Sequence, residues 1–255
     1  MRICDAVVPS VAVSTTSRSL SFVLPFWNEV EGAVRTIEVV SQAAAELVET
    51  SVVAKVEILA VNDGSTDATA QLLDSLAAEN DYLRVVHHKV NQGLGGALRT
   101  GFMEANSDWI FYTDSDLPVD PMVCERAFRA TELHDADIVA CYRLDRTGEG
   151  LRREVLSTVY NTAVRVVTGL NVRDVNFAAK LLRRESVADC LPQSNSLFFD
   201  AELLARAMRA GATLQQIGVD YFPRSVGTST LSSMRSIRDT AQDLARLGPT
   251  VSIRK

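Results

Sequence analysis

The chain has 255 residues, of which 47% are hydrophobic and 23% are charged, and its formal net charge is -6. These values are typical of a soluble globular protein, and the acidic balance argues against a general nucleic-acid binder, whose surface is basic. The four cysteines are scattered, which excludes a zinc site or disulfide framework and favours a reducing, cytoplasmic environment. No apolar run approaches the ~20 residues that a membrane-spanning helix needs.

Residues 1–20 contain many Ser and Thr residues and only a short apolar run, so we expect a flexible leader there. Beyond it, neither a Pro-, Gly- or Ser-rich linker nor an internal repeat divides the sequence. We therefore expect one compact domain over residues 21–247 and a short tail over residues 248–255.

The first 140 residues alternate apolar runs with segments of helical periodicity. The runs predict strands at 21–26, 56–61, 83–87, 109–113 and 137–142, and the segments between them predict helices at 31–50, 68–78 and 121–134. Such alternation is typical of βαβ units, so we expect an α/β fold with a mostly parallel central sheet flanked by helices. Beyond residue 150 the pattern predicts helices at 151–168, 201–210 and 231–247 and strands at 177–182 and 213–222.

Acidic residues follow three of the predicted strands. Glu29 comes after the first strand, Asp63 after the second, and Asp114 and Asp116 directly after the strand at 109–113. The carboxyl ends of parallel strands share one edge of a sheet, where ligands bind in folds of this kind. We therefore expect these side chains to line one crevice.

Two of these carboxylates, Asp114 and Asp116, lie one residue apart at the end of an apolar strand. Carboxylates beside a core are costly without a positive partner, and their hard oxygen atoms suit Mg²⁺ or Mn²⁺. Asp and Ser are also common in turns, so an isolated pair of this kind is more often a strand-to-loop turn. The other acidic strand ends favour a divalent metal that holds the phosphates of a ligand.

Glycines and cations supply further candidates. Gly93 lies in a glycine-rich segment, 91–101, where backbone could approach a phosphate closely at a helix start. Arg143, Lys180 and Arg224 each lie in or after a predicted strand. Singly, such residues are more often solvated surface charges, but three cations facing an acidic metal site would fit a ligand rich in phosphates.

The helix predicted at 231–247 carries an apolar stripe with three arginines between its apolar positions. We expect this helix to pack on the domain, and contact with an anionic membrane surface is the alternative. The three histidines have no nucleophile or metal-ligand partner at a suitable spacing, so we assign them no catalytic role.

Six motifs, in this order, resemble those of the family 2 glycosyltransferases of the GT-A fold, and within them the dolichol- and polyprenol-phosphate sugar synthases. The motifs are LPFWNE at 24–29, VNDGSTD at 61–67, NQGLGGALRTG at 91–101, TDSD at 113–116, DVNFAAK at 174–180 and YFPRSVG at 221–227. Each motif alone is weak evidence, but six in the family's order are specific. The resemblance covers residues 21–229.

The resemblance implies a GT-A nucleotide-diphospho-sugar transferase fold, with a nucleotide-binding half at 21–118 and an acceptor half at 119–247. It implies that the nucleotide is bound by Pro25, Trp27, Glu29, Asp63, Gly93 and Asp114. The implied cofactor is Mg²⁺ or Mn²⁺, with Asp116 as its direct ligand and Asp114 beside it, and both carboxylates are the implied catalytic residues. The phosphates of donor or acceptor would be held by Arg143, Lys180 and Arg224.

Two positions depart from the family's pattern. Pro118 stands where many relatives have a glutamine that helps to bind the metal, which leaves the number of metal ligands open. Gly218 stands where many relatives have proline, a difference that concerns the strand rather than the chemistry.

The function that the resemblance implies is metal-dependent, inverting transfer of a sugar from a GDP- or UDP-sugar to a polyprenyl phosphate. The protein would then be cytoplasmic, with peripheral contact to the cytoplasmic face of a membrane. A phosphate acceptor is already anionic at pH 7 and needs no strong base, which agrees with the lack of an obvious acid–base pair. Two alternatives stay open: the same fold with a soluble hydroxyl acceptor, where a carboxylate of the metal motif would act as base, and a nucleotide-sugar-binding module without catalysis.

Overall fold

The structure is a computed structural model that describes residues 17–145, 151–222 and 234–253. The strands in these ranges are β1 (Ser19–Phe26), β2 (Lys55–Asn62), β3 (Leu83–His87), β4 (Trp109–Thr113), β5 (Ile138–Arg143), β6 (Ala179–Arg183) and β7 (Leu214–Val219). They form one seven-stranded sheet in the order β3-β2-β1-β4-β6-β5-β7. Strand β6 is antiparallel to β4 and β5, and the other pairs are parallel. The expected α/β class with a mostly parallel sheet is confirmed.

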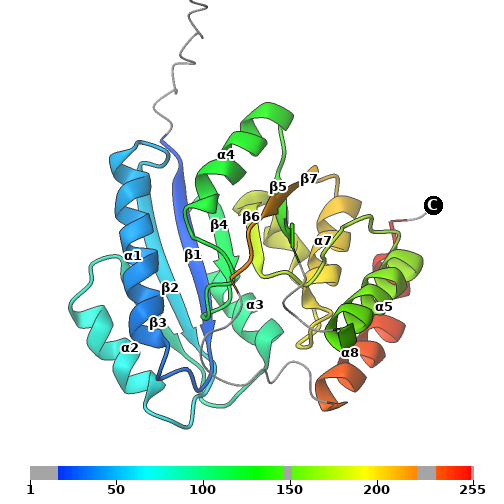
Figure 1. Ribbon diagram of the computed structural model, residues 1–255, viewed down its shortest axis with the longest axis horizontal. Helices are drawn as coiled ribbons and strands as arrows, with labels where there is room; N and C mark the ends of the chain where they lie inside the picture. The colour runs from blue at the N-terminus through cyan, green and yellow to red at the C-terminus, as the bar shows by residue number, and fades with distance from the viewer. Residues whose placement is uncertain (1–16, 146–150, 223–233, 254–255) are drawn as a thin grey trace, which may run out of the picture.

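Helices cover both faces of this sheet (Figure 1). The core on one face includes residues of α1 (Ala33–Glu49), α2 (Thr69–Ala78) and α4 (Val123–His134). The core on the other face includes residues from α3 (Leu94–Glu104), α5 (Leu151–Thr168), α6 (Arg184–Val187), α7 (Phe199–Arg209) and α8 (Met234–Leu247). Two short 3₁₀ turns, η1 (Ala188–Cys190) and η2 (Gly248–Val251), complete the described elements.

Alternating side chains along β1 separate the two layers of the core. Phe22 and Leu24 point into the layer that contains α1 and α4, and Val23 points into the layer that contains α3. All three are fully buried. A slip of one residue would exchange the two faces, so burial on both sides sets the register in which Phe26 lies beside Asn62.

The packed unit extends beyond both boundaries expected from the sequence. Strand β1 begins at Ser19, inside the expected leader, of which residues 1–16 lie outside the described part of the chain. At the other end, Val251 in η2 is buried, and the Ile253 N–H donates to the Thr168 carbonyl at the end of α5 (2.8 Å). Residues 248–253 therefore belong to the domain and not to a tail, because their apolar side chains continue the core.

Most predicted elements lie within a few residues of the observed ones, and the main omission is α3. This helix covers the glycine-rich segment, whose low helix propensity hides it from a pattern-based prediction. The last helix, α8, is described from Met234 and packs on the domain through Leu244 and Leu247, as expected.

The carboxylate of Asp137, just before β5, joins three strands of the sheet. One oxygen of Asp137 accepts hydrogen bonds from Arg183 Nε (3.0 Å) and the Ser186 hydroxyl (3.0 Å), and the other accepts from the Thr213 N–H (2.9 Å) and hydroxyl (3.0 Å). Burial alone would raise the pKa of Asp137, but these hydrogen bonds and the charge of Arg183 outweigh it and lower the pKa. The interactions join β5, β6 and β7 at one point.

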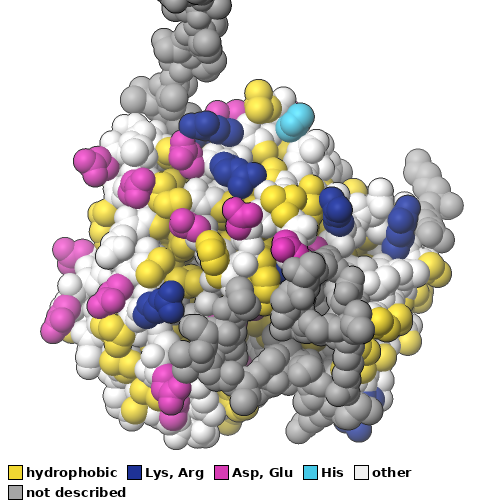
Figure 2. Space-filling view, in the orientation of Figure 1, with side chains coloured by type: hydrophobic (Ala, Val, Ile, Leu, Met, Phe, Trp, Pro, Cys, Tyr) yellow, Lys and Arg dark blue, Asp and Glu magenta, His cyan; other side chains and the backbone are white. Residues whose placement is uncertain are grey.

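Figure 2 shows the surface of the same view with side chains coloured by type. Acidic side chains are frequent over α1 and α2, whereas Lys and Arg side chains are scattered. Hydrophobic side chains are exposed along α5, where Val155, Val159 and Val166 have exposed fractions of 59%, 61% and 59%. These side chains form an apolar stripe on α5 that the described residues leave exposed.

Candidate functional site

The loops after β1, β2 and β4 leave the sheet at the same edge. Phe26 pairs with Asn62 in the parallel ladder between β1 and β2, and Val23 pairs with Tyr112 between β1 and β4. The three acidic segments that follow these strands therefore start side by side. The structure thus brings together the candidate nucleotide-binding residues of the first half of the chain.

The first two of these loops are locked to each other by Asn28. This residue adopts a positive φ of 54°, which Asn tolerates better than most residues. Its side-chain oxygen accepts a hydrogen bond from the Thr66 N–H (2.8 Å), and its own N–H donates to the Ser65 hydroxyl (3.0 Å). Trp27 is left 40% exposed beside the half-buried Pro25.

Glu29 belongs to the same lock, because its N–H donates to the Thr69 hydroxyl at the start of α2 (2.9 Å). Asn28, unlike Pro25, Trp27 and Glu29 of the same motif, is not among the site residues predicted from the sequence. The Asn before Glu29 in the first motif, together with the Ser and Thr of the second, was the signal that could have identified the lock.

The Asp63 side chain fixes the start of the glycine-rich segment through hydrogen bonds. Its side chain is buried, and its oxygens accept hydrogen bonds from the N–H groups of Gln92 (2.8 Å) and Gly93 (2.9 Å). Oδ1 also lies 2.6 Å from His88 Nδ1, and the other ring nitrogen of His88 contacts the Thr100 hydroxyl (2.8 Å). His88, which the sequence analysis set aside, is therefore a partner of a site residue. Asp63 positions the turn at Gly93, whose φ is +81°.

Gly95 of α3 leaves room for the loop 193–196. A Cβ atom added at Gly95 would lie 2.4 Å from the Ser194 carbonyl oxygen and 2.8 Å from Asn195 Cα. The Gly95 N–H also donates to the Asn195 carbonyl (3.3 Å). The glycine-rich sequence predicts close approach of this segment to a ligand; at Gly95 the structure shows close approach to the loop 193–196 instead.

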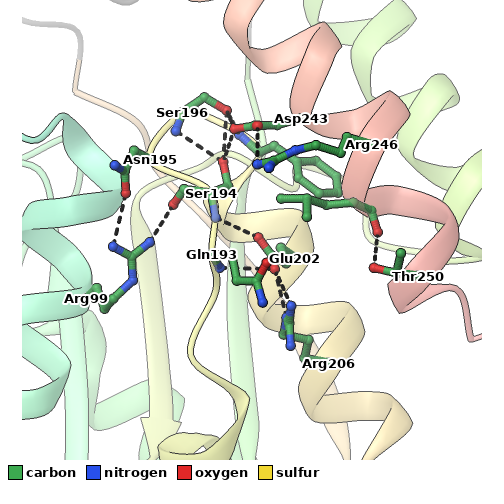
Figure 3. A network of polar contacts seen from close by, with 12 residues as sticks. Arg99, Gln193, Ser194, Asn195, Ser196, Glu202, Arg206, Asp243, Arg246 and Thr250 are labelled. Atoms are coloured by element: carbon green, nitrogen blue, oxygen red, sulfur yellow. Dashed lines mark hydrogen bonds and ion pairs between the residues drawn. The ribbon is translucent and has the colours of Figure 1, made fainter.

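Three helices hold this loop in place (Figure 3). Arg99 of α3 donates to the Pro192 and Ser194 carbonyls and to the Asn195 side chain, at 2.8 to 3.0 Å. Glu202 of α7 is fully buried and accepts from the N–H groups of Gln193 (3.0 Å) and Ser194 (2.9 Å), while Arg206 pairs with it at 2.7 Å. Asp243 of α8 accepts from the hydroxyls of Ser194 (2.6 Å) and Ser196 (2.9 Å). The loop thus connects the C-terminal helix to the turn that Asp63 holds.

Asp114 and Asp116 lie in a tight turn after β4, and both are partly exposed. The Leu117 N–H closes the turn on the Asp114 carbonyl (3.1 Å), and Leu117 has a positive φ of 48°. Between the two carboxylates the Ser115 carbonyl accepts a hydrogen bond from the Thr36 hydroxyl of α1. The backbone between the acidic side chains is therefore fixed to the helix that follows the first loop.

The donor set of this turn fits a divalent cation. Carboxylate oxygens are hard donors of the kind that Mg²⁺ and Mn²⁺ prefer. Asp116 has contacts within the chain, but its buried Oδ1 atom receives no hydrogen bond from the described residues. Pro118 is buried, and its carbonyl accepts the Phe222 N–H (3.0 Å). Among the described residues no group of three His, Cys, Asp or Glu side chains forms a complete metal site, so a bound cation would take further ligands from a diphosphate and water, as Mg²⁺ commonly does.

Arg143 lies at the end of β5 on the same edge of the sheet. Its guanidinium forms a two-bond fork with Asp174 at 2.8 and 3.0 Å. It also lies 5.5 Å from the ring centroid of Phe177 and 5.4 Å from that of Tyr221. These contacts aim the guanidinium in one direction, as an anion-binding arginine requires. Arg224, the third expected cation, lies outside the described residues.

Lys180 does not reach the surface of the crevice, which corrects the expectation that it binds phosphate directly. Its side chain is fully buried, and Nζ donates to the Phe177 carbonyl (2.7 Å) and the Tyr112 hydroxyl (2.9 Å) and lies 3.1 Å from an oxygen of Asp200. The reason is the antiparallel pairing of β6, which sets Lys180 beside Tyr112 and turns it toward α7.

The buried pair of Lys180 and Asp200 is electrostatically unusual. Burial lowers the pKa of Lys180 to about 7, although the charge of Asp174 opposes this shift. Burial also raises the pKa of Asp200 well above its ordinary value, and the Tyr112 hydroxyl donates to the same carboxylate. Asp200 was not among the sequence candidates; the FD pair at the start of an expected helix was its one local signal.

In an open α/β sheet ligands bind at the carboxyl edge, which is where these acidic and glycine-rich loops lie. The family model described as glycosyl transferase family 2 matches residues 21–191. The chain belongs to this family and is a family 2 glycosyltransferase.

Individual relatives agree with this assignment. Glycosyltransferase AglD of Haloferax volcanii is 30% identical over 95% of the chain, and the chain spans 39% of that protein. Polyprenol monophosphomannose synthase of Mycolicibacterium smegmatis is 28% identical over 92% of the chain and 89% of its own length. Glucosyl-3-phosphoglycerate synthase of Mycobacterium tuberculosis, solved with Mn²⁺ and UDP-glucose, has a TM-score of 0.64 at 24% identity, covering 91% of the chain and 79% of its own. This last likeness shows the GT-A fold.

Proposed function

We propose that the protein transfers a sugar from a nucleotide-diphospho-sugar to a polyprenyl phosphate. The observation that carries this proposal is the placement of the carboxylate turn at Asp114 and Asp116 on the same sheet edge as the fixed guanidinium of Arg143. The carboxylates suit a cation-bound diphosphate, and the guanidinium suits an anionic acceptor. The similarity to polyprenol monophosphomannose synthase supports this choice of acceptor.

The residues at this edge would divide the work. Trp27, with Pro25 beside it, offers an exposed ring for the base of the nucleotide, while Glu29 and Asp63 supply the polar side chains of that pocket. Asp63 would act in part through Gly93, because it holds the N–H of that residue in the turn. GDP-sugars and UDP-sugars are both compatible donors in this proposal.

Asp114 and Asp116 would hold a Mg²⁺ or Mn²⁺ ion. Such an ion supplies Lewis-acid stabilisation of the negative charge that builds on the departing diphosphate. Similar folds have been solved with either metal, since the mycobacterial synthase is known with Mn²⁺ and with Mg²⁺. The chain's own contribution is to fix both carboxylates, through the turn at Leu117 and the hydrogen bond to Thr36.

The acceptor phosphate would act as the nucleophile, held by Arg143. It carries negative charge at pH 7, so no side chain has to remove a proton before the attack. Asp174 keeps the guanidinium oriented, and Lys180 with Asp200 holds the Tyr112 hydroxyl of β4, the strand that precedes the carboxylate turn. A direct displacement of this kind gives a product with inverted anomeric configuration.

Peripheral contact with a membrane is part of the proposal, because a polyprenyl chain is insoluble in water. Among the described residues, none of the helices is long and apolar enough to cross a bilayer. The exposed valines of α5 support a surface contact, since exposed apolar side chains gathered on one face of a helix are typical of an interaction site.

The test is transfer of radiolabelled sugar from GDP- and UDP-sugars to undecaprenyl phosphate in detergent, followed by extraction of the lipid product. We expect lipid-linked label with one donor and Mn²⁺ or Mg²⁺. Asp116→Asn should lower the rate at least about 100-fold, the scale on which loss of transition-state charge stabilisation acts. The control is Asp81→Asn, an exposed carboxylate before β3. Label found only in a water-soluble acceptor, or an unchanged rate in Asp116→Asn, would refute the proposal.

A further inference from the structure

A polar hollow lies outside the crevice, between α5, the loop 171–173 and β7. Its volume is about 550 Å³, within the range of about 300–1,000 Å³ that is usual for ligand sites. Among the described residues that line it are Tyr142, Thr162, Arg165, Asn171, Arg173 and Gln216. Of the described residues that line it, two are arginines and none is acidic, in a chain whose formal net charge is -6. The described lining of the hollow is therefore basic, although the protein as a whole is acidic.

The walls of the hollow are held in place without a ligand. Gln216 of β7 accepts the Arg173 N–H through its side-chain oxygen (2.8 Å) and donates from its side-chain nitrogen to the Asn171 carbonyl (3.2 Å). The guanidinium of Arg173 lies 4.6 Å from the ring centroid of Tyr142. One of the two cations is thus stacked on a wall of the hollow, which lowers the entropy lost when it binds an anion.

The hollow and the crevice lie on opposite sides of β5. Tyr142 lines the hollow, while the next residue, Arg143, pairs with Asp174 at the crevice. Likewise Arg173 lines the hollow, and Asp174 follows it directly in the chain. Tyr142 and Arg143 are successive residues of β5 and point to opposite faces of the sheet, so the two sites share a backbone but not side chains.

We propose that this hollow is a second anion site, which binds a phosphate group on a small polar ligand. Guanidinium groups bind phosphate oxygens through paired charge-assisted hydrogen bonds, and the amide and hydroxyl groups of the lining suit the polar remainder. The polar lining excludes an isoprenoid chain as the main occupant. The proposal does not depend on the sugar acceptor, since binding here requires neither donor nor metal.

Two sources could present such a phosphate. Thr158, Thr162 and Arg165 line one face of α5, and the exposed Val155, Val159 and Val166 lie on the adjacent face of the same helix. An anionic lipid headgroup would place its chains toward these valines, whereas a soluble phosphate ester would occupy the hollow alone. The chemistry at the arginines is the same in both cases.

The first arm of the test is an NMR titration of the whole chain with glycerol 3-phosphate, with EDTA present and without nucleotide. The reporters are the backbone amides of Arg173 and Gln216. We compare the wild type, the double variant Arg165→Gln/Arg173→Gln and the crevice variant Arg143→Gln. The control is Arg129→Gln, at an arginine on α4 whose side chain is 70% exposed. The second arm is co-sedimentation of the same proteins with phosphatidylcholine vesicles, with and without phosphatidylglycerol.

We expect the double variant to bind at least about tenfold more weakly than the wild type, because each arginine supplies a charge-assisted hydrogen bond. Arg129→Gln should behave as the wild type. If the double variant binds phosphatidylglycerol vesicles more weakly than the wild type, the phosphate belongs to a lipid headgroup. If the double variant is weaker only in the glycerol 3-phosphate titration, the phosphate belongs to a soluble ester. If neither arm separates the double variant from Arg129→Gln, or if the shifts vanish in Arg143→Gln and persist in the double variant, the anion binds elsewhere and the proposal is wrong.

Discussion

Replacing Gly95 with alanine tests whether the loop 193–196 packs on the nucleotide side of the domain as the structure shows. The new Cβ atom would lie 2.4 Å from the Ser194 carbonyl oxygen, whereas ordinary contacts begin at 3.4 Å. The loop would therefore have to retreat by about 1 Å. It cannot do so freely, because Arg99 and Glu202 hold its backbone on either side.

The expected cost follows from three contributions. Overpacking costs about 1–3 kcal/mol, and a stretched hydrogen bond to a charged group costs about 1.5–3 kcal/mol. Alanine returns about 1 kcal/mol, because it forms helix better than glycine. The net loss of unfolding free energy should be about 1.5–5 kcal/mol, which lowers the melting temperature of a domain of this size by roughly 3–20 °C.

The assay is urea unfolding followed by circular dichroism, with Gly32→Ala as the matched control. Gly32 precedes α1, and a Cβ added there would meet nothing within 4 Å. We expect this control to change stability by no more than about 0.5 kcal/mol. Gly95→Ala should also weaken UDP or GDP binding at a temperature where it stays folded, because the loop supports the turn at Gly93. Equal stability of the two alanine variants would refute the packing argument.

Three other substitutions probe separate parts of the same structure. Glu202→Gln should lose about 1–3 kcal/mol of unfolding free energy, because it removes a buried carboxylate that accepts hydrogen bonds from two backbone N–H groups. The exposed control Glu185→Gln should leave stability unchanged in the same urea assay. Because the pKa of Asp137 is lowered in the folded protein, its carboxylate stabilises the fold above its ordinary pKa of 3.8 and loses this effect as the pH falls further. The urea midpoint of Asp137→Asn should therefore differ from that of the wild type at pH 6, and the two midpoints should converge toward pH 2. Asp174→Asn should raise KM for the lipid acceptor more than KM for the donor, because it loosens Arg143; equal changes in both would count against that role.

The part of the fold that the sequence predicts well is the part encoded locally. Each strand end at the crevice is an apolar run followed at once by turn-forming polar residues, so Asp63, Asp114 and Asp116 could be placed on one edge without a structure. The parallel alternation of strands and helices then leaves few topologies to choose from. The turn after β4 and the loops after β1 and β2 accordingly lie where the pattern places them.

The part that the sequence does not predict depends on contacts between distant segments. Whether Lys180 faces the crevice or α7 is decided by the antiparallel pairing of β6 with β4, and no local pattern specifies that pairing. Gly95 resembles a ligand-binding glycine until the loop 193–196 is known to lie against it. His88 becomes a partner of Asp63 only because β2 and β3 are neighbours in the sheet. In each case the sequence shows the residue itself, but the partner that determines its role lies far along the chain.

The division of the chain into a nucleotide-binding half at 21–118 and an acceptor half at 119–247 does not correspond to a division of the structure. Strand β4 lies between β1 of the first half and β6 of the second, so separating the halves would expose its unpaired backbone. The Tyr112 hydroxyl, two residues before Asp114, is held by Lys180 and Asp200 of the second half. The loop 193–196 of that half also supports the glycine turn of the first. The geometry of the carboxylate pair is therefore a property of the whole sheet and not of residues 21–118 alone.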